Sequence, residues 1–419
     1  MKLVELCEYY SPQGGGVRIY VENKLAAARQ CGIDLLVIAP GTENREEPHA
    51  GGRIAWVRSP RLPLDPRYHV FGRAAAVHAI LERERPDLVE VSSLLRAPAI
   101  AASWGRPVRH LLFLHSDPIA SYLEPLLARW PDGWGGERIR EAGWSWLRRL
   151  AARFDGTIVA ADWLADRLAA HGLKAPAVIP LGVETGLFRP ALRSETLRRT
   201  LLGACGIDHA EARLLLVVGR LHPEKRVGLL LDAFARLRDR LPVGLCIIGD
   251  GPLAGKIARR AASEQGVHFA GPVRDRTTLA RVMASADLLL HGCASETFGL
   301  VIGEALSSGL PVIVPDRGGA AAYAREAVAE VYRSGEVTDC VRAVSRMLAR
   351  LSPDLRAQCA RAARASLIPP MAHFERLFEH YRRLAAGLDA RARAAATPAS
   401  ASDHSLAITT QPLGMRQLP

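Results

Sequence analysis

The sequence predicts two doubly wound α/β domains joined in one chain of 419 residues. Three observations lead to this prediction. The chain is too long for a single hydrophobic core, short apolar runs alternate with helix-period segments almost throughout, and this alternation occurs in two successive series. Strands that alternate with helices across short turns form parallel sheets that helices cover on both faces.

The predicted strands fall into two series, separated by a polar stretch near Leu181–Ala212. The first series is Leu3–Cys7, Leu35–Ala39, Leu88–Val91, Val108–Leu114, Gly156–Val159 and Ala177–Ile179. The second series is Leu214–Val218, Val243–Ile248, Val267–Phe269, Asp287–Leu290 and Pro311–Val314. Helix-period segments such as Val227–Arg240 and Leu253–Glu264 lie between the strands.

These series set the expected domain boundaries. We expect an N-terminal domain over residues 1–190 and a C-terminal domain over 191–370. An amphipathic helix over 371–390 follows, which could cross back to the first domain. The last segment, 391–419, is rich in Ala, Ser, Thr and Pro, and it is expected to be a disordered tail.

Composition indicates a globular protein of the cytoplasm. The chain is 49% hydrophobic and 23% charged, and it lacks the run of about 18 apolar residues that a membrane span needs. The N-terminus has the pattern of a first strand, not of a signal peptide. The seven cysteines are scattered without metal-ligand spacing, which favours buried free thiols over disulfides or a zinc site.

The chain is basic, with 55 Lys and Arg against 43 Asp and Glu, a formal net charge of +12. Such a balance suits nucleic acid, anionic lipid or phosphorylated small molecules as partners. Arginine is spread along the whole chain and no nucleic-acid-binding motif occurs, so we do not expect a nucleic-acid partner. Arg-rich codon usage is an alternative origin of the excess charge.

The most informative element is Ser295–Glu304, in which Glu296 and Glu304 flank Phe298-Gly299. A strand, a turn and a helix fit this pattern, with Glu296 in the turn and Glu304 within about 10 Å of the helix start at roughly 1.5 Å of rise per residue. Free backbone N–H groups at a helix start suit a phosphate, and a nearby carboxylate can accept hydrogen bonds from sugar hydroxyls. The alternative is two carboxylates with no joint role.

Three more candidate segments follow strands of the second series. Gly219-Arg220 and Lys225 flank a turn, so the guanidinium and the ammonium could reach one diphosphate; a surface run of charges is the alternative. Asp250 lies in the tight turn Gly249–Leu253, where capping of the next helix is the alternative role. A glycine turn at Pro315–Gly319 could bring backbone close to a sugar or a phosphate.

The first series offers two candidates. Gly14, Gly15 and Gly16 follow the first strand and would let the backbone approach an anion closely; a turn that only connects two elements is the alternative. This loop does not match the dinucleotide fingerprint, because no acidic residue ends the second strand. His115 follows an apolar strand, at the sheet edge where ligands bind; a structural histidine is the alternative.

Together these motifs resemble the retaining glycosyltransferases of family 4, whose GT-B fold has two facing Rossmann-like domains. The resemblance runs from Met1 to about Leu388. It rests on a set of motifs in this order: Pro180–Pro190, Gly219-Arg220 with Glu224-Lys225, Gly249–Leu253, and Glu296/Glu304 with Phe298-Gly299.

The resemblance implies a role for each candidate residue. Arg220 and Lys225 would hold the donor diphosphate, and Glu296 would contact the transferred sugar. Glu304 would accept a hydrogen bond from the ribose, and His115 would touch the sugar. The remaining donor-site residues implied are Gly15, Gly16, Gly219, Asp250, Phe298, Gly299 and Leu300.

The resemblance also implies the reaction, a retaining hexosyl transfer from a nucleoside-diphosphate sugar to a glycan or lipid-linked acceptor. UDP-sugars are the commoner donors of the family, with GDP-mannose as the rival. Arg220 and Lys225 can stabilise charge that develops on the leaving diphosphate. Since the chain has no acidic cluster placed for a divalent ion, we expect a metal-independent enzyme without a cofactor. The alternatives are a GT-B epimerase or phosphorylase, and a non-catalytic basic module that binds lipid or nucleic acid.

The segment 129–154 combines four of the seven tryptophans with several arginines. This composition suits an anionic membrane interface, which would give a peripheral position at the inner membrane face. It also suits a buried helix whose polar face is solvated, which is the slightly favoured alternative.

Overall fold

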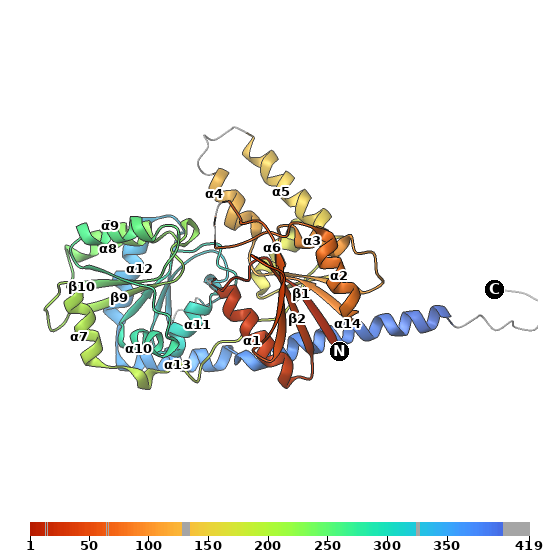
Figure 1. The fold of residues 1–419 in the computed structure, drawn as a ribbon. Coiled ribbons are helices and arrows are strands. Elements are labelled where there is room, and N and C mark those ends of the chain that lie inside the picture. The colour runs from red at the N-terminus through yellow and green to blue at the C-terminus, as the bar shows by residue number, and fades with distance from the viewer. Residues whose placement is uncertain are drawn as a thin grey trace, which may run out of the picture.

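The chain folds into two α/β domains that lie side by side, each built around its own sheet (Figure 1). The computed structural model describes residues 1–12, 14, 16–63, 65, 67–127, 135–323 and 327–396. Over these residues the N-terminal sheet has eight strands in the order β3-β4-β2-β1-β5-β6-β7-β8. The C-terminal sheet has six, in the order β11-β10-β9-β12-β13-β14. The predicted fold class is confirmed.

The N-terminal sheet is parallel except at one edge, where β3 pairs antiparallel with β4. Its strands are β1 (Lys2–Leu6), β2 (Asp34–Gly41), β3 (Arg45–His49), β4 (Gly52–Arg58), β5 (Leu88–Val91), β6 (Arg109–Leu114), β7 (Gly156–Val159) and β8 (Ala177–Val178). Its helices are α1 (Gly16–Gln30), α2 (Ala74–Glu84), α3 (Ala97–Ala102), α4 (Glu124–Leu127), α5 (Gly136–Ala151) and α6 (Asp162–Ala170), with a helical turn at Ile119–Leu123. Because helices cover both faces of the sheet, its central strands are mostly apolar, with Glu5 of β1 and Glu90 of β5 as exceptions.

The C-terminal sheet is parallel throughout its described strands. Its strands are β9 (Arg213–Val218), β10 (Val243–Ile248), β11 (Val267–Gly271), β12 (Leu288–Leu290), β13 (Val312–Pro315) and β14 (Ala329–Tyr332). Its helices are α7 (Glu195–Ala204), α8 (Val227–Arg238), α9 (Ala254–Ser263), α10 (Arg276–Ser285), α11 (Leu300–Ser307), α12 (Val337–Arg350) and α13 (Pro353–Ser366). Short helical turns lie at Pro190–Leu192, Pro223–Lys225 and Ala321–Tyr323.

Three strands of the structure had no counterpart in the sequence prediction: β3, β4 and β14. The sequence of β3 is polar and contains Pro48, which is tolerated because β3 is an edge strand. β3 and β4 form a hairpin, with His49 opposite Gly52, so no helix separates them. The strict strand-helix alternation that guided the prediction fails at this edge.

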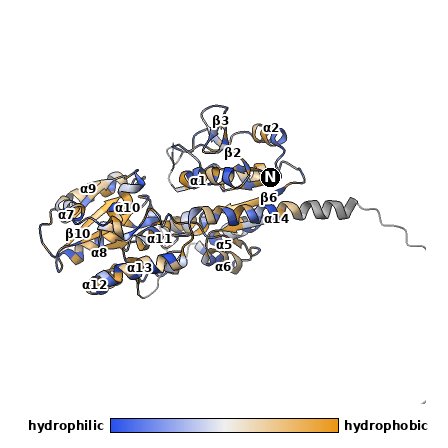
Figure 2. Cartoon of the chain, turned by 90° about the horizontal axis from the view of Figure 1, so that it is seen from below, coloured by the Kyte–Doolittle hydropathy of each residue, from blue (hydrophilic) through white to orange (hydrophobic). Residues whose placement is uncertain are grey.

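The last helix, α14 (Pro370–Ala396), returns from the C-terminal domain to the N-terminal one. Its residues Phe374, Leu377 and Phe378 are buried in the core that α1 forms with the N-terminal sheet. Figure 2 shows α14 running along this domain. The helix continues to Ala396, and the rest of the predicted tail, 397–419, lies outside the described residues.

A fully buried ionic cluster joins α14 to the N-terminal sheet. Lys24 of α1 donates to Glu5 of β1 at 2.9 Å and to Glu90 of β5, and the Tyr381 hydroxyl donates to Glu90 at 2.5 Å. All four side chains are 0% exposed. Removing one partner of a buried ion pair typically costs roughly 3–5 kcal/mol, so this cluster stabilises the packing of α14 against the domain.

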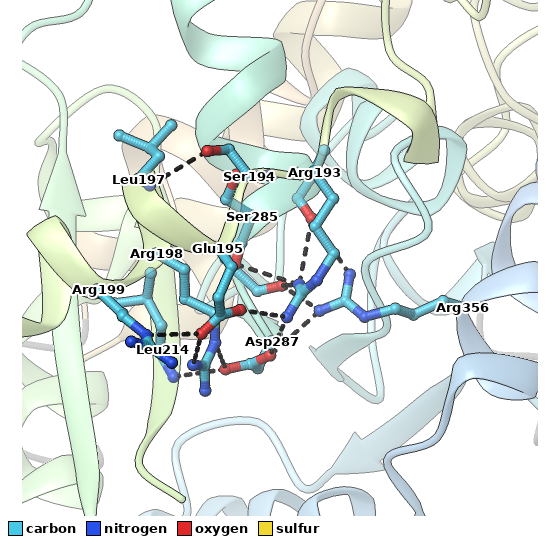
Figure 3. Close-up of polar contacts among 12 residues, drawn as sticks. Arg193, Ser194, Glu195, Leu197, Arg198, Arg199, Leu214, Ser285, Asp287 and Arg356 are labelled. Atoms are coloured by element: carbon cyan, nitrogen blue, oxygen red, sulfur yellow. Dashed lines mark hydrogen bonds and ion pairs between the residues drawn. The ribbon is translucent and has the colours of Figure 1, made fainter. Parts of the chain in front are cut away.

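A second ionic cluster fastens the start of the C-terminal domain (Figure 3). Asp287, which directly precedes β12, accepts hydrogen bonds from Arg198 at 2.9 Å, Arg356 at 3.2 Å and Arg193 at 3.4 Å. Arg193 follows the turn where the chain enters this domain, and Arg356 belongs to α13. The cluster lies at the amino end of β12, opposite the end that leads to Glu296, so its role is structural.

Candidate active site

The loop that carries Glu296 follows the carboxyl end of β12 and leads into α11. Gly299 is the N-cap residue of α11 at φ +81°, a conformation that favours glycine. Gly319 donates its backbone N–H to the Glu296 carbonyl at 2.6 Å, and a Cβ at this position would collide with the Thr297 carbonyl. The glycine turn at Pro315–Gly319, which was predicted to approach a ligand, therefore packs against the backbone of the Glu296 loop.

Glu296 forms an ion pair with Lys225 of the second motif. Lys225 Nζ lies 2.6 Å from Glu296 Oε2, and His291 Nε2 lies 3.4 Å from the same oxygen. Burial acts to raise the pKa of Glu296, but Lys225 and His291 together hold it well below the ordinary value. Burial likewise opposes the charge on Lys225, and Glu296 outweighs this effect, so the Lys225 pKa is raised. Both groups are charged at neutral pH.

Arg220 lies in the turn after β9, next to Gly219, and contacts the opposite domain. Its Nη2 is 3.2 Å from Oδ2 of Asp65, which also pairs with Arg67 at 2.8 Å. Asp65 is therefore an N-terminal-domain carboxylate in contact with the predicted diphosphate-binding arginine. The sequence prediction missed Asp65, because nothing in its local sequence marks a contact with a residue 155 positions away.

Glu304 lies inside α11 and pairs with an arginine that the sequence prediction also missed. Arg276, the first residue of α10, donates to Glu304 at 2.7 Å and to Glu184 at 2.9 Å. Burial raises the pKa of Glu304 despite the Arg276 charge beside it. Glu184 belongs to the Pro180–Pro190 motif, so a signal existed for it, whereas no motif contains Arg276.

The candidates of the N-terminal domain lie at the carboxyl end of its sheet. His115 follows β6, and its ring packs against Tyr20 and Phe113 with centroids 5.0 and 4.6 Å away. Among the described residues its Nε2 has no hydrogen-bond partner. Burial lowers the His115 pKa to about 4, so the imidazole is neutral at pH 7. Gly16 begins α1, while Gly15 lies outside the described residues.

The other predicted donor-site residues divide between the α11 start and a separate turn. Leu300 is the first residue of α11, whose start has no side-chain cap, and the Phe298 ring contacts Tyr323 edge-on. Asp250 accepts from the adjacent Gly251 N–H at 2.8 Å, so in this structure it stabilises its own turn. The N–H groups that could cradle a phosphate are thus those at the start of α11.

Direct contacts between the domains bring the two halves of the site together. Besides the Asp65–Arg220 pair, Trp163 of α6 donates its indole N–H to the Thr297 carbonyl at 2.7 Å. Thr297 is the neighbour of Glu296, so the N-terminal domain contacts the Glu296 loop itself. Arg220 and the Glu296 loop of the second domain therefore lie at the interface with the first.

One group of side chains near Glu296 has ligand atoms suited to a metal ion. His291, Cys293 and Glu296 place these atoms within 4.8 Å of one another. The Lys225 ammonium already neutralises the only carboxylate of this group and would repel a cation. The prediction of metal-independent catalysis stays a prediction, and so do the catalytic and donor-binding roles of the individual residues.

Two family models match the chain. One, described as Glycosyltransferase Family 4, covers residues 14–187, and the other, described as Glycosyl transferases group 1, covers residues 212–350. A GDP-mannose-dependent alpha-mannosyltransferase of Mycolicibacterium smegmatis is 30% identical over 76% of this chain and 80% of its own length. A GDP-mannose-dependent alpha-(1-6)-phosphatidylinositol dimannoside mannosyltransferase of Mycobacterium tuberculosis is 28% identical over 75% of this chain and 79% of its own length.

Solved structures share the architecture. The sucrose-phosphate synthase of Thermosynechococcus elongatus superimposes with a TM-score of 0.73 at 19% identity. The match covers 92% of this chain and all of that one. At this identity the likeness concerns the fold, which is the two-domain arrangement described above.

Proposed function

This chain belongs to glycosyltransferase family 4, and we propose that it transfers mannose from GDP-mannose to a glycolipid acceptor with retention of configuration. That it is a hexosyltransferase with the GT-B fold follows from its relatives and from the fold. The comparisons favour neither a GT-B epimerase nor a non-catalytic binding module. The identity of the donor, the identity of the acceptor and the stereochemistry of the transfer are what we propose.

The donor proposal rests on the relatives. The relative that is 30% identical and the dimannoside mannosyltransferase are both named as GDP-mannose-dependent. The sequence alone favoured a UDP-sugar over GDP-mannose. We propose the GDP form because these relatives align over about three quarters of the chain, including both domains.

The charges at the Glu296 loop support a diphosphate leaving group. Cleavage of the glycosidic bond leaves negative charge on the β-phosphate, and preorganised cations and helix N–H groups stabilise such charge as it develops. We propose that Arg220, Lys225 and the α11 start supply this stabilisation without a metal ion. Arg220 would exchange its contact with Asp65 for the diphosphate.

The sugar would lie between Glu296 and His115. Because its pKa is lowered, Glu296 is ionised at neutral pH and can accept hydrogen bonds from sugar hydroxyls. Its ion pair with Lys225 makes it a weak nucleophile, which favours attack on the same face as the departing phosphate over a covalent intermediate. Glu304 would accept a hydrogen bond from the ribose, sharing its carboxylate with Arg276.

We also propose that the α4–α5 region touches a membrane that carries the acceptor. Leu126 of α4 and Trp146 of α5 are 58% and 42% exposed, and α5 also bears exposed Arg138 and Arg149. Aromatic, aliphatic and arginine side chains together suit an anionic interface.

Part of the segment 129–154 does not support membrane contact. Trp144 is buried and stacks on His171 at 3.8 Å, as the alternative of a buried helix requires. Trp130 and Trp134 lie outside the described residues. Among the helices in the described part of the chain, none combines the length and apolar character that crossing a bilayer requires. The membrane proposal is therefore one of peripheral contact, and loss of vesicle binding in Trp146→Ala would support it.

Calorimetric titration with GDP-mannose, UDP-glucose and ADP-glucose tests the donor. We expect GDP-mannose to bind at least about tenfold more tightly than the others, a difference of about 1.4 kcal/mol. NMR of the product anomer and assays in EDTA test the rest. Tighter binding of UDP-glucose would overturn the GDP proposal, an inverted anomer would overturn retention, and loss of activity in EDTA would overturn metal independence.

A further inference from the structure

An arginine-rich groove lies on the N-terminal domain, beside the ends of β2 and β4. It has a volume of about 780 Å³ and includes Thr42, Arg58, Arg61, His69 and Arg73 in its lining. Arg58 is the last residue of β4 and lies opposite Gly41, the last residue of β2. Open α/β sheets bind ligands at the carboxyl ends of their parallel strands, so the groove occupies a position suited to a ligand.

The charge of the groove is of one sign. Arg58, Arg61 and Arg73 are exposed, and none of the described lining residues is acidic. Burial and the Arg61 charge both lower the pKa of His69. A guanidinium presents a fork of donors that matches the oxygens of a phosphate. Three such side chains around a groove of this size suit an anion larger than a single ion.

The groove is also continuous with the donor side of the site. Thr42 and His69 line both the groove and a smaller cavity of about 160 Å³. Arg67 lines that smaller cavity and pairs with Asp65, which in turn lies 3.2 Å from Arg220. A molecule seated in the groove could therefore extend past Arg67 toward the predicted diphosphate-binding arginine.

We propose that the groove lined by Arg58, Arg61 and Arg73 binds a phosphodiester of the acceptor and thereby positions its hydroxyl toward the donor. This inference rests on the proposed function, because it places an acceptor opposite the donor site. The chemistry is that of a phosphodiester, which either the headgroup of a lipid or a soluble molecule could supply. Arg58, Arg61 and Arg73 are positioning residues that act on the acceptor and do not touch the reacting atoms.

Calorimetry with glycerophosphoinositol, a soluble phosphodiester, tests the groove directly, with uncharged myo-inositol as the control ligand. We expect glycerophosphoinositol to bind and myo-inositol to bind much more weakly. Arg61→Gln and Arg73→Gln should each weaken phosphodiester binding by roughly tenfold, the size expected for one charge-assisted hydrogen bond. Arg240→Gln, which removes an exposed charge from the C-terminal domain, should leave it unchanged.

The same variants separate the possible outcomes. GDP-mannose should bind equally to wild type, Arg61→Gln and Arg73→Gln. If GDP-mannose bound to none of the three proteins, the result would count against the proposed donor, not against the groove. If the phosphodiester bound all variants equally, or bound no more tightly than myo-inositol, the groove proposal would be overturned.

Vesicles distinguish a lipid from a soluble source. Co-sedimentation with phosphatidylinositol vesicles, compared with phosphatidylcholine vesicles, should weaken in Arg61→Gln if the phosphodiester belongs to a lipid. Unchanged vesicle binding together with weaker glycerophosphoinositol binding would support a soluble acceptor. Weaker vesicle binding without any binding of the soluble phosphodiester would overturn an acceptor site and leave only attraction to the membrane surface.

Discussion

Glu296 and Glu304 are eight residues apart, yet their surroundings act on them in opposite directions. Glu296 lies in a loop, 2.6 Å from the Lys225 ammonium, and its pKa is lowered. Glu304 lies in a helix, 2.7 Å from the Arg276 guanidinium, and its pKa is raised. Glu304 is buried and Glu296 is partly buried, and each lies beside a cation, so the presence of a cation does not by itself explain the difference.

The difference in pKa shift follows from how many neighbouring groups favour the ionised carboxylate and so oppose the effect of burial. Glu296 has both Lys225 and His291 beside it, whereas Glu304 has Arg276 together with the repulsion of Glu184. Arg276 also divides its hydrogen bonds between Glu184 and Glu304. We infer that the Glu296 end holds fixed charge for the reacting sugar and diphosphate, and that the Glu304 end is a weaker ionic contact for the ribose.

The largest loss of activity is expected from a substitution beside Glu296. Lys225→Ala removes the cation that we propose stabilises the leaving phosphate, and it leaves Glu296 without its ammonium partner. We expect kcat to fall by roughly 10²–10³, as for loss of one preorganised group that stabilises transition-state charge. Steady-state kinetics with saturating donor measures it.

A double variant tests whether Lys225 and Glu296 act as a unit. Residues that share one interaction have non-additive effects, so Lys225→Ala/Glu296→Gln should lose little more activity than Lys225→Ala alone. Additive losses of activity would show that the two side chains act separately. The proposed contrast between a paired Glu296 and Glu304 would then be wrong.

At the Glu304 end we expect a change in donor affinity instead of turnover. Glu304→Gln keeps the shape of the side chain but weakens its proposed hydrogen bond to the ribose, so donor KM should rise by roughly tenfold. The value of kcat should change little. Glu184→Gln is the matched control, because it removes the other carboxylate that binds Arg276. A larger loss of kcat in Glu304→Gln than in Lys225→Ala would reverse the proposed roles.

Acid pH should separate the two ends without mutation. The Glu304 pKa lies above its ordinary 4.5, so protonation begins as pH falls through the window above 4.5 and should raise donor KM there. The Glu296 pKa lies below 4.5, so this carboxylate stays charged in the same window. Glu304→Gln should flatten the dependence of donor KM on pH; an unchanged dependence would mean that another group titrates.

The two shifts also have opposite effects on folding stability. Glu304 is protonated more readily in the folded state, so as an ionised group it destabilises the fold above pH 4.5 and this cost is relieved on acidification. Glu296 stabilises the fold above pH 4.5 and loses this contribution as pH falls below that value. Urea denaturation of Glu304→Gln and Glu296→Gln across this pH range should show the opposite signs.

The smallest change in donor binding is expected from substitution of Asp65. Arg220 is 43% exposed, and such pairs contribute about 0–1 kcal/mol. Asp65→Asn should release Arg220 for the diphosphate and tighten donor binding by less than about fivefold, with less effect at high salt. Weaker donor binding in Asp65→Asn would show that Asp65 positions Arg220 instead of competing for it.

Much of the fold could be predicted because apolar periodicity is a local signal. The bounds of β5, β7 and β10 match the predicted strands, since each is a short buried run between polar turns. The hairpin of β3 and β4 escaped prediction because a polar edge strand lacks that signal. Likewise, no local pattern placed Tyr381 against Glu90, 291 residues away.

The sequence by itself determined the two α/β domains and the residues of the Glu296–Glu304 element, because strand burial and helix rise act over a few residues. Tertiary structure alone decided which cations those carboxylates meet: Lys225 lies 71 residues from Glu296, and Arg276 lies 28 residues from Glu304. It also decided that Asp65 contacts Arg220 and that three arginines line one groove. Ionisation depends on burial and on the charges within a few ångströms, and in a folded chain both are set by residues distant in sequence.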